Sequence, residues 1–183
     1  MKKKILFVFM VLAMLLTSVC YSSKSGINAD GECSIGWITP GITTSADLIA
    51  AYGQPIRKNI SSDGSGSMLW APGGYVGVFW DKGTNTEGPI SVVYCINYEF
   101  NDMGLYTPRG LHIGMTLEEA VSLYGIDIND DYFLGGDPAF SVKDRLDNTY
   151  LNVQSHTVKG GMRYIERIEI GLWDSDRARS LFH

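Results

Sequence analysis

One helix motif occurs twice in this chain, and this repeat constrains the fold more than any other feature of the sequence. Residues 40–53 read PGITTSADLIAAYG, and residues 113–125 read IGMTLEEAVSLYG. Self-similarity at a fixed offset indicates a repeated structural unit. Four positions recur at an offset of 72, which is 116 minus 44: Thr44, Asp47, Tyr52 and Gly53 align with Thr116, Glu119, Tyr124 and Gly125.

Each copy has the sequence signature of a short amphipathic helix. Its threonine suits the N-cap position, and the acidic residue three positions later completes a capping box. An apolar stripe at helical spacing follows, and a glycine can then end the helix. We therefore predict helices over residues 44–52 and 116–124. Both tyrosines belong to the stripes that we expect in the core, which are Leu48 and Tyr52, then Leu117, Val121 and Tyr124.

Strand-like segments follow each helix and are separated by turns that contain Gly or Pro. Their alternating apolar residues predict strands over 67–71, 75–81 and 90–100, then 139–143, 150–158 and 164–173. Successive side chains of a strand point to opposite faces. In the segment 150–158 we therefore expect Leu151 and Val153 to face the helix. The residues that alternate with them are expected to face solvent, and these are Tyr150, Asn152, Gln154 and His156.

These elements predict an α+β fold of two tandem modules, each a short helix packed on an antiparallel sheet. The predicted domains are a signal segment over 1–23, a first module over 24–103 and a second module over 104–183. The strand-rich halves are joined by a linker over 101–107.

The two helix motifs resemble the opening motif of the family that includes the β-lactamase inhibitor proteins and small outer-membrane lipoproteins of the SmpA/OmlA type. In that BLIP-like family a G-[IM]-T-x-x-[ED] helix precedes an antiparallel sheet, and the inhibitor proteins carry two such modules in tandem. The resemblance implies this fold and a preference for protein partners over chemistry. The inhibitor proteins have two disulfides, whereas this chain has at most one after residue 23.

The N-terminus has the organisation of a secretory signal. Lysines at positions 2–4 precede an apolar run over 5–16, and small residues follow at 17–20. A retained membrane anchor is the alternative, but the run is shorter than the roughly 20 residues of a spanning helix. We expect an exported protein of a bacterial cell envelope or its surroundings.

The three cysteines allow two predictions. Cys20 stands where a lipoprotein carries its acylated cysteine, but Thr17 and Val19 depart from the usual lipobox. Lipidation of Cys20 and plain cleavage near residues 20–23 therefore both stay open. Cys33 and Cys95 follow, and an exported pair favours a disulfide. The alternative is that Cys95 is a small buried hydrophobic residue.

The charge of the chain argues against two classes of partner. The formal charge is −5, from 15 Lys plus Arg against 20 Asp plus Glu. Without the three lysines of the signal the balance is 12 against 20, or −8. No Lys/Arg-rich stretch occurs after residue 4, so we expect no binding of nucleic acid, and membrane contact only through a lipid anchor.

No pattern of catalytic or metal-ligating residues stands out in the sequence. His112, His156 and His183 are far apart and lack the spacing of a zinc site. The acidic segment from Asp127 resembles the start of a calcium loop, but the sixth and twelfth positions are Tyr132 and Pro138 instead of Gly and Glu. We predict no metal, no cofactor and no enzymatic activity.

Aromatic residues on the predicted strands, with arginines among them, are typical of protein-binding surfaces. The alternative is that the helices bury these side chains in the core. The predicted binding face, on the side of the sheet that the helices leave open, consists of Trp70, Trp80, Tyr150, Arg167 and Trp173.

The sequence thus predicts an exported, non-enzymatic protein-binding protein whose partner is not identified. Two alternatives stay open. One is a small secreted hydrolase whose carboxylates the sequence does not pair, and the other is a structural envelope lipoprotein.

Overall fold

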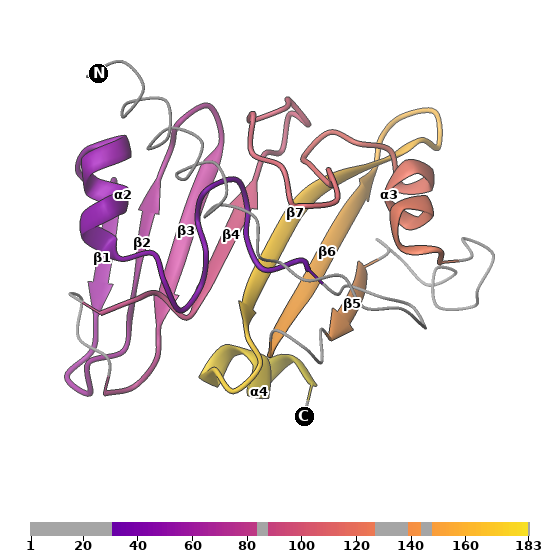
Figure 1. Cartoon of the computed structure of the whole chain (residues 1–183). Helices are drawn as coiled ribbons and strands as arrows, with labels where there is room; N and C mark the ends of the chain where they lie inside the picture. Colours follow the sequence, from indigo (N-terminus) through magenta and orange to yellow (C-terminus); the bar gives the residue numbers. More distant parts are fainter. Residues whose placement is uncertain (1–30, 84–87, 127–138, 144–147, 183) are drawn as a thin grey trace, which may run out of the picture.

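The computed structural model describes residues 31–83, 88–126, 139–143 and 148–182. These residues form an α+β fold in which short helices accompany one large sheet (Figure 1). In chain order the elements are α2 (Ser45–Tyr52), β1 (Arg57–Ile60), β2 (Gly66–Trp70), β3 (Tyr75–Trp80), β4 (Val92–Ile96), α3 (Leu117–Tyr124), β5 (Ala139–Lys143), β6 (Thr149–Thr157), β7 (Arg163–Leu172) and α4 (Asp176–Phe182).

Both predicted helices are confirmed, together with their caps. Thr44 and Thr116 are the N-caps of α2 and α3, and each threonine side chain accepts a hydrogen bond from the backbone N–H three residues later, at 3.3 Å. The carboxylates of Asp47 and Glu119 accept hydrogen bonds from the backbone N–H groups of Thr44 and Thr116, so both capping boxes are complete. These hydrogen bonds lower the pKa of both carboxyl groups.

The described strands form one antiparallel sheet in the order β1-β2-β3-β4-β7-β6-β5. Strands β1 to β4 follow one another from one edge of the sheet to its centre. There β4 pairs with β7, and β6 and β5 continue to the other edge, so the last strands of the two halves pair at the centre. We expected a sheet for each module, and the structure joins both sets of strands in one. Pairing of β4 with β7 removes two edges that would otherwise expose unpaired backbone groups.

The strand β1 and the helix α4 are not predicted by the sequence pattern. All four residues of β1 are exposed, so its sequence shows no alternation of apolar and polar residues. The helix α4 follows the last strand closely. Its first backbone N–H, that of Asp176, donates to Asp81 at the end of β3 at 3.0 Å. Tertiary contacts of this kind are not visible in a local sequence pattern.

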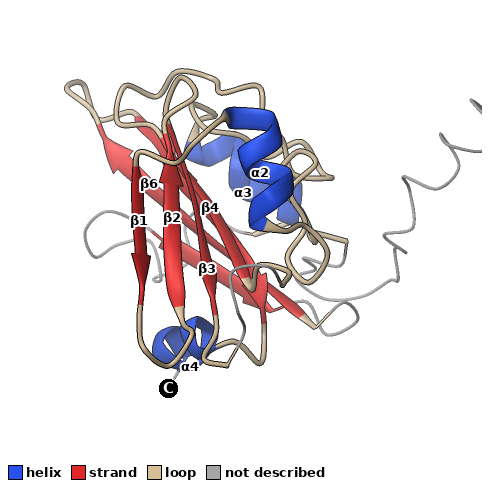
Figure 2. Cartoon of the chain, turned by 90° about the vertical axis from the view of Figure 1, so that its left-hand side faces the viewer, coloured by secondary structure: helices blue, strands red, loops and turns tan. Residues whose placement is uncertain are grey.

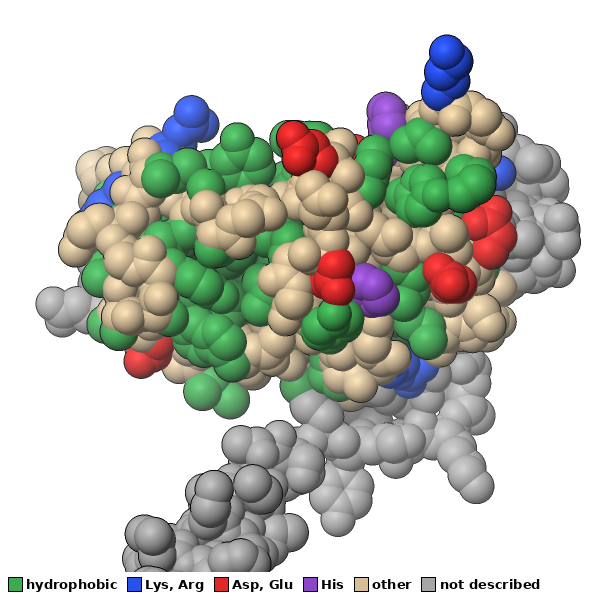
Figure 3. Space-filling model, turned by 90° about the horizontal axis from the view of Figure 1, so that it is seen from above, with side chains coloured by type: hydrophobic (Ala, Val, Ile, Leu, Met, Phe, Trp, Pro, Cys, Tyr) green, Lys and Arg blue, Asp and Glu red, His purple; other side chains and the backbone are tan. Residues whose placement is uncertain are grey.

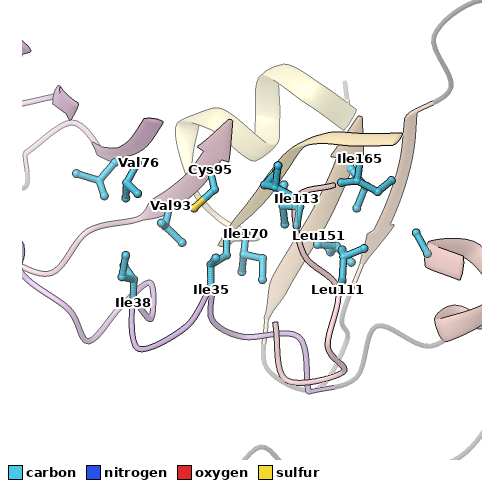
Figure 4. Packing of buried hydrophobic residues seen from close by; sticks show 14 of the residues in the cluster. Ile35, Ile38, Val76, Val93, Cys95, Leu111, Ile113, Leu151, Ile165 and Ile170 are labelled. Carbon is cyan, nitrogen blue, oxygen red and sulfur yellow. The ribbon is translucent and has the colours of Figure 1, made fainter. Parts of the chain in front are cut away.

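The helices α2 and α3 cover the same face of the sheet, which we call the proximal face (Figure 2). The opposite face, turned away from α2 and α3, is called the distal face. The helix α4 lies at the lower end of the sheet. The incoming segment before α2 also packs on the proximal face. Its Ile35 and Ile38 are fully buried and lie beneath Val93 and Cys95 of β4 (Figure 4).

The strand β6 follows the predicted alternation, with one correction. Leu151 and Val153 are buried in the proximal core, as expected. The prediction that Tyr150 and Asn152 face solvent is wrong, since they are only 0% and 4% exposed. They point to the distal face, where Tyr150 donates to the buried carboxylate of Glu169, which Arg177 of α4 also binds. The helix that the sequence did not predict thus contributes to the burial of Tyr150.

The predicted disulfide between Cys33 and Cys95 is wrong. Cys95 is a free thiol and only 1% exposed, whereas Cys33 is bonded in another disulfide. Strand alternation places Cys95 on the proximal face, with Val76 and Ile168 as its neighbours on β3 and β7. It is the small buried hydrophobic residue of the alternative interpretation. The predicted signal segment and Cys20 lie outside the described residues.

We expect the thiol of Cys95 to stay unmodified in the native protein. Burial raises the pKa of this thiol to about 12, so the reactive thiolate is scarce at neutral pH. Maleimide labelling followed by peptide mass spectrometry should therefore find modified Cys95 only after a denaturant is added. Labelling of Cys95 in a sample whose circular dichroism stays native would contradict this burial.

Candidate functional site

The structure separates the five residues that the sequence placed on one binding face. Trp70 and Trp80 are only 1% and 2% exposed and belong to the proximal core, so their assignment to a binding face is wrong. The indole N–H of Trp70 donates to the carbonyl oxygen of Gly53 at 2.8 Å, just beyond α2. Side chains alternate between the two faces along a strand. On β3, Trp80 therefore lies on the same face as Val76 and Val78, which are both fully buried.

The other three predicted residues lie at the second half of the chain. Tyr150 and Arg167 both point to the distal face, where they meet at the carboxylate of Glu169. Trp173 lies just beyond the end of β7, where its backbone N–H donates to the carbonyl oxygen of Asn148 at 2.7 Å. The structure thus brings together two of the five predicted residues, but Tyr150 is fully buried, so its assignment to a binding face is also wrong.

The register of the sheet arranges the distal face in straight rows. One row crosses the sheet through Cα partners on successive strands: Arg57, Leu69, Gly77, Tyr94, Glu169 and Asn152. The row on one side of it contains Phe79, Val92, Gly171 and Tyr150. The row on the other side contains Tyr75, Ile96, Arg167 and Gln154. We call the partly or well exposed members around the centre the distal patch, which comprises Leu69, Tyr75, Phe79, Tyr94, Ile96 and Arg167.

Two glycines allow aromatic rings to lie flat on this face. A Cβ atom at Gly77 would be 2.0 Å from Cζ of Tyr94, and one at Gly171 would be 2.7 Å from Cε1 of Tyr150. Any larger residue would therefore displace the ring beside it. A glycine inside a strand often marks such a close approach. The ring of Phe79 extends the surface, because its centroid lies 5.4 Å from that of Tyr94.

The carboxylate of Glu169 is the centre of the distal face. It is fully buried and accepts four hydrogen bonds from three side chains. Arg177 of α4 donates through Nε at 3.1 Å and Nη2 at 3.4 Å, Tyr150 donates at 2.9 Å, and Arg167 donates through Nη2. A buried charge with several charge-assisted partners holds those partners in fixed positions.

The arginine and tyrosine side chains form a stacked arrangement above this carboxylate. The guanidinium carbon of Arg167 lies 5.0 Å from the ring centroid of Tyr94, which is within the range of a cation–π contact. Burial raises the pKa of both Tyr94 and Tyr150, and the negative charge of Glu169 adds to the shift at Tyr150. Both phenols therefore stay neutral at physiological pH. The arrangement offers guanidinium donors and aromatic surface in fixed positions.

The sequence analysis did not identify Glu169 or Arg177, and it did not establish which face of the sheet the helices cover. One feature of the sequence distinguishes the two faces. On β3, Tyr75, Gly77 and Phe79 alternate with residues that are β-branched or Trp, so the glycine marks the face on which another side chain lies. No local signal connects Arg177 with Glu169, because that contact depends on where α4 docks.

A second buried carboxylate ties the incoming segment to the second half of the chain. Glu32 is fully buried, and its Oε1 accepts a hydrogen bond from the backbone N–H of Arg109 at 3.1 Å. The guanidinium of Arg109 lies 3.7 Å from the same oxygen and 5.4 Å from the ring centroid of Tyr124 on α3. Burial raises the pKa of Glu32, against the opposing effect of its hydrogen bonds with Thr107 and Arg109.

This raised pKa predicts a stability difference that depends on pH. A carboxyl group whose pKa is raised by folding stabilises the fold below its ordinary value of 4.5, and this contribution is lost as the pH rises through the folded value. We therefore expect wild type to lose stability relative to Glu32→Gln as the pH rises above 4.5. Thermal unfolding of both proteins across this range measures the difference.

A variant of opposite sign provides the control for this prediction. Capping lowers the pKa of Glu119, so its contribution is present above the ordinary value of 4.5 and is lost as the pH falls. Wild type should therefore gain stability relative to Glu119→Gln as the pH rises. If the Glu32→Gln comparison has the same sign as the Glu119→Gln comparison, the buried carboxylate does not titrate as described.

Large hydrophobic side chains are also exposed outside the distal patch. The view from above shows such side chains spread over this end of the molecule, with acidic and histidine side chains between them (Figure 3). The exposed ones belong to loops and to the edge around β1, and are Trp37, Ile42, Ile56, Ile60, Tyr98, Tyr106 and Met162. They come from several separate elements, whereas the distal patch occupies one face of the sheet. The distal patch is therefore the better candidate site.

Two further findings concern the described residues alone. No group of three or more His, Cys, Asp or Glu side chains among them could hold a metal ion. None of the helices within the described ranges is long and apolar enough to cross a membrane.

Comparison with known proteins gives one distant likeness. No protein-family model matches the chain, and no curated protein matches it. A solved structure of an extracellular protein containing a SCP domain from Bacillus anthracis str. Ames is similar, with a TM-score of 0.42 and 13% sequence identity. The similarity covers 83% of this chain and 50% of that chain, so this chain spans about half the length of the protein it matches.

Proposed function

We propose that this chain is an exported, non-enzymatic protein-binding protein of a bacterial envelope or its surroundings, and that the distal patch is its binding surface. The observation that carries the proposal is the fixed arrangement of arginine and aromatic side chains around the buried carboxylate of Glu169. Tyrosine and arginine side chains dominate the binding energy of protein interfaces. Side chains that are ordered before binding lose less conformational entropy when a partner docks.

The composition of the distal patch fits this role. Leu69, Phe79, Tyr94 and Ile96 are only partly buried, and Tyr75 is 39% exposed. Apolar side chains that stay partly exposed on an ordered sheet retain free energy that a partner can gain by covering them. The signal segment of the sequence supports export, and we infer that this surface meets its partner outside the cytoplasm.

We further propose that the two halves of the chain are tandem modules of the BLIP-like type. The repeated motif and the equivalent capped helices α2 and α3 support this interpretation. So does the strand order, in which each half contributes its last strand to the centre of the sheet. In this arrangement the distal face is a single surface to which both halves contribute.

Affinity purification with matched variants tests the proposed function. Immobilised mature protein should recover a specific protein from envelope extract, and Phe79→Ser in the distal patch should abolish the recovery. The matched control is Ile42→Ser, which removes an apolar side chain that is 75% exposed just before α2. Equal recovery by wild type and Phe79→Ser, or loss of recovery with Ile42→Ser alone, would show that the partner binds outside the distal patch.

A further inference from the structure

The charges on the distal face are opposite in sign to those of the whole chain. The chain has a formal charge of −5. The charged side chains around Tyr94, at the centre of the distal patch, are nevertheless Arg57 and Glu169 in its own row, Arg167 in the neighbouring row, and Arg177, which binds Glu169. Three of these four groups are arginines, so the centre of this face is locally positive among the described residues.

Exposure makes this positive charge accessible and hides the negative one. The side chains of Arg167 and Arg177 are 20% and 34% exposed, whereas the side chain of Glu169 is 0% exposed. Arg57 on β1 is exposed. A partner that approaches the distal face therefore meets guanidinium groups, while the carboxylate that orders them stays inside.

The other charged groups that the structure describes near this face lie at its ends. At the lower end, Asp63, Asp81, Asp174 and Asp176 lie near only two basic side chains, Lys82 and Arg179, so this end is acidic. At the upper end, Glu166 lies 4.0 Å from the imidazole of His156. Among the residues that the structure describes, the excess of positive charge therefore lies at the centre, next to the ring of Tyr94.

The guanidinium groups also keep hydrogen-bonding capacity. An arginine side chain has several N–H donors. Arg167 binds Glu169 through Nη2, and its side chain is 20% exposed, so the guanidinium group can donate further hydrogen bonds at the surface. Guanidinium groups recognise carboxylates with two parallel hydrogen bonds when the geometry allows it. The cation–π contact with Tyr94 holds Arg167 in position for such a contact.

We propose that the partner docks a protein segment with an Asp or Glu side chain onto the distal patch, where Arg167 and Arg177 bind its carboxylate beside the ring of Tyr94. This inference rests on the proposed function and specifies the chemistry of the partner. Apolar side chains that flank the carboxylate pack on Leu69 and Phe79. A protein segment satisfies both parts of the surface, whereas a small free anion would leave these apolar side chains uncovered.

Selection from a random peptide library displayed on phage tests the proposal directly. Peptides are selected on immobilised mature protein and kept when Phe79→Ser abolishes their binding, so that only ligands of the distal patch remain. We expect these peptides to be enriched in Asp or Glu next to apolar residues. Their affinity should fall as the salt concentration rises, because ions screen exposed charges.

Two neighbouring residues of β1 provide a matched pair of charge reversals. Arg57 points to the distal face, and Lys58 is exposed on the same strand with the opposite parity. Arg57→Glu and Lys58→Glu change the total charge equally. We expect Arg57→Glu to weaken the selected acidic peptides about tenfold and Lys58→Glu to leave them nearly unchanged. Arg167→Gln should abolish the binding in a protein that circular dichroism shows to be folded.

The possible outcomes separate this inference from the proposed function. Distal-patch peptides without acidic residues, or equal effects of Arg57→Glu and Lys58→Glu, would contradict the binding of a carboxylate from the partner. The distal patch would still be the binding surface. A selection that yields no peptide sensitive to Phe79→Ser would overturn both. Enrichment of acidic residues together with a selective effect of Arg57→Glu is the result that the structure leads us to expect.

Discussion

Replacing Glu169 by alanine is expected to lower the free energy of unfolding by about 3–5 kcal/mol. The carboxylate is fully buried and accepts hydrogen bonds from Arg167, Arg177 and Tyr150. Its removal leaves two partly buried guanidinium groups next to each other without their common anion. Breaking a buried ion pair by removing one partner is costly for this reason, even where the intact pair adds little to stability. Urea denaturation followed by circular dichroism measures the change.

The control for this prediction lies on the same strand. Glu166 is 21% exposed and lies 4.0 Å from His156, so Glu166→Ala should change the free energy of unfolding by less than about 1 kcal/mol. A loss of under about 1 kcal/mol for Glu169→Ala as well would show that the carboxylate does not organise the distal face.

Alanine at Trp80 and alanine at Phe79 are expected to have opposite consequences for stability and binding. Trp80 is 2% exposed in the proximal core, so Trp80→Ala should cost about 3–5 kcal/mol of stability. Phe79 is the neighbouring residue but points to the distal face and is only partly buried. Phe79→Ala should cost about 1 kcal/mol and should lower partner affinity about tenfold or more.

Thermal unfolding and a binding measurement on both variants check this pair. The comparison is sharp because the two large aromatic residues are adjacent in the chain and point to opposite faces of the sheet. A stable Trp80→Ala protein with impaired binding, or a strongly destabilised Phe79→Ala protein, would mean that the two faces of the sheet are assigned the wrong way round.

The helices and most strands could be predicted because their determinants are local. A capping threonine, an acidic residue three positions later and an apolar stripe are enough to define α2 and α3. Alternation defines β3, β4, β6 and β7 in the same way. The strand β1 was missed because an exposed edge strand has no buried side chains to create a pattern.

The candidate site was predicted only in part, because it depends on contacts between distant segments. Alternation groups residues into two faces, but it does not say which face the helices cover. For this reason Trp70 and Trp80 were assigned to the wrong side, and Cys95 was paired instead of buried. The contact of Arg177 with Glu169 requires the docking of α4, which residue spacing along β7 does not encode. Arg167 was found because an arginine among aromatic side chains is recognisable in any strand, whereas Tyr150, also assigned to the binding face, is fully buried and is not part of the distal patch.

Site-specific photocrosslinking tests the central claim most directly. A benzophenone amino acid is placed at Leu69 in the distal patch or, as the control, at Ile42 before α2, and the protein is irradiated in the producing cell. We expect a crosslinked protein partner from Leu69 and none from Ile42, and the Leu69 product should disappear when Phe79→Ser is added. A partner that crosslinks to Ile42 and not to Leu69 would contradict the assignment of binding to the distal face.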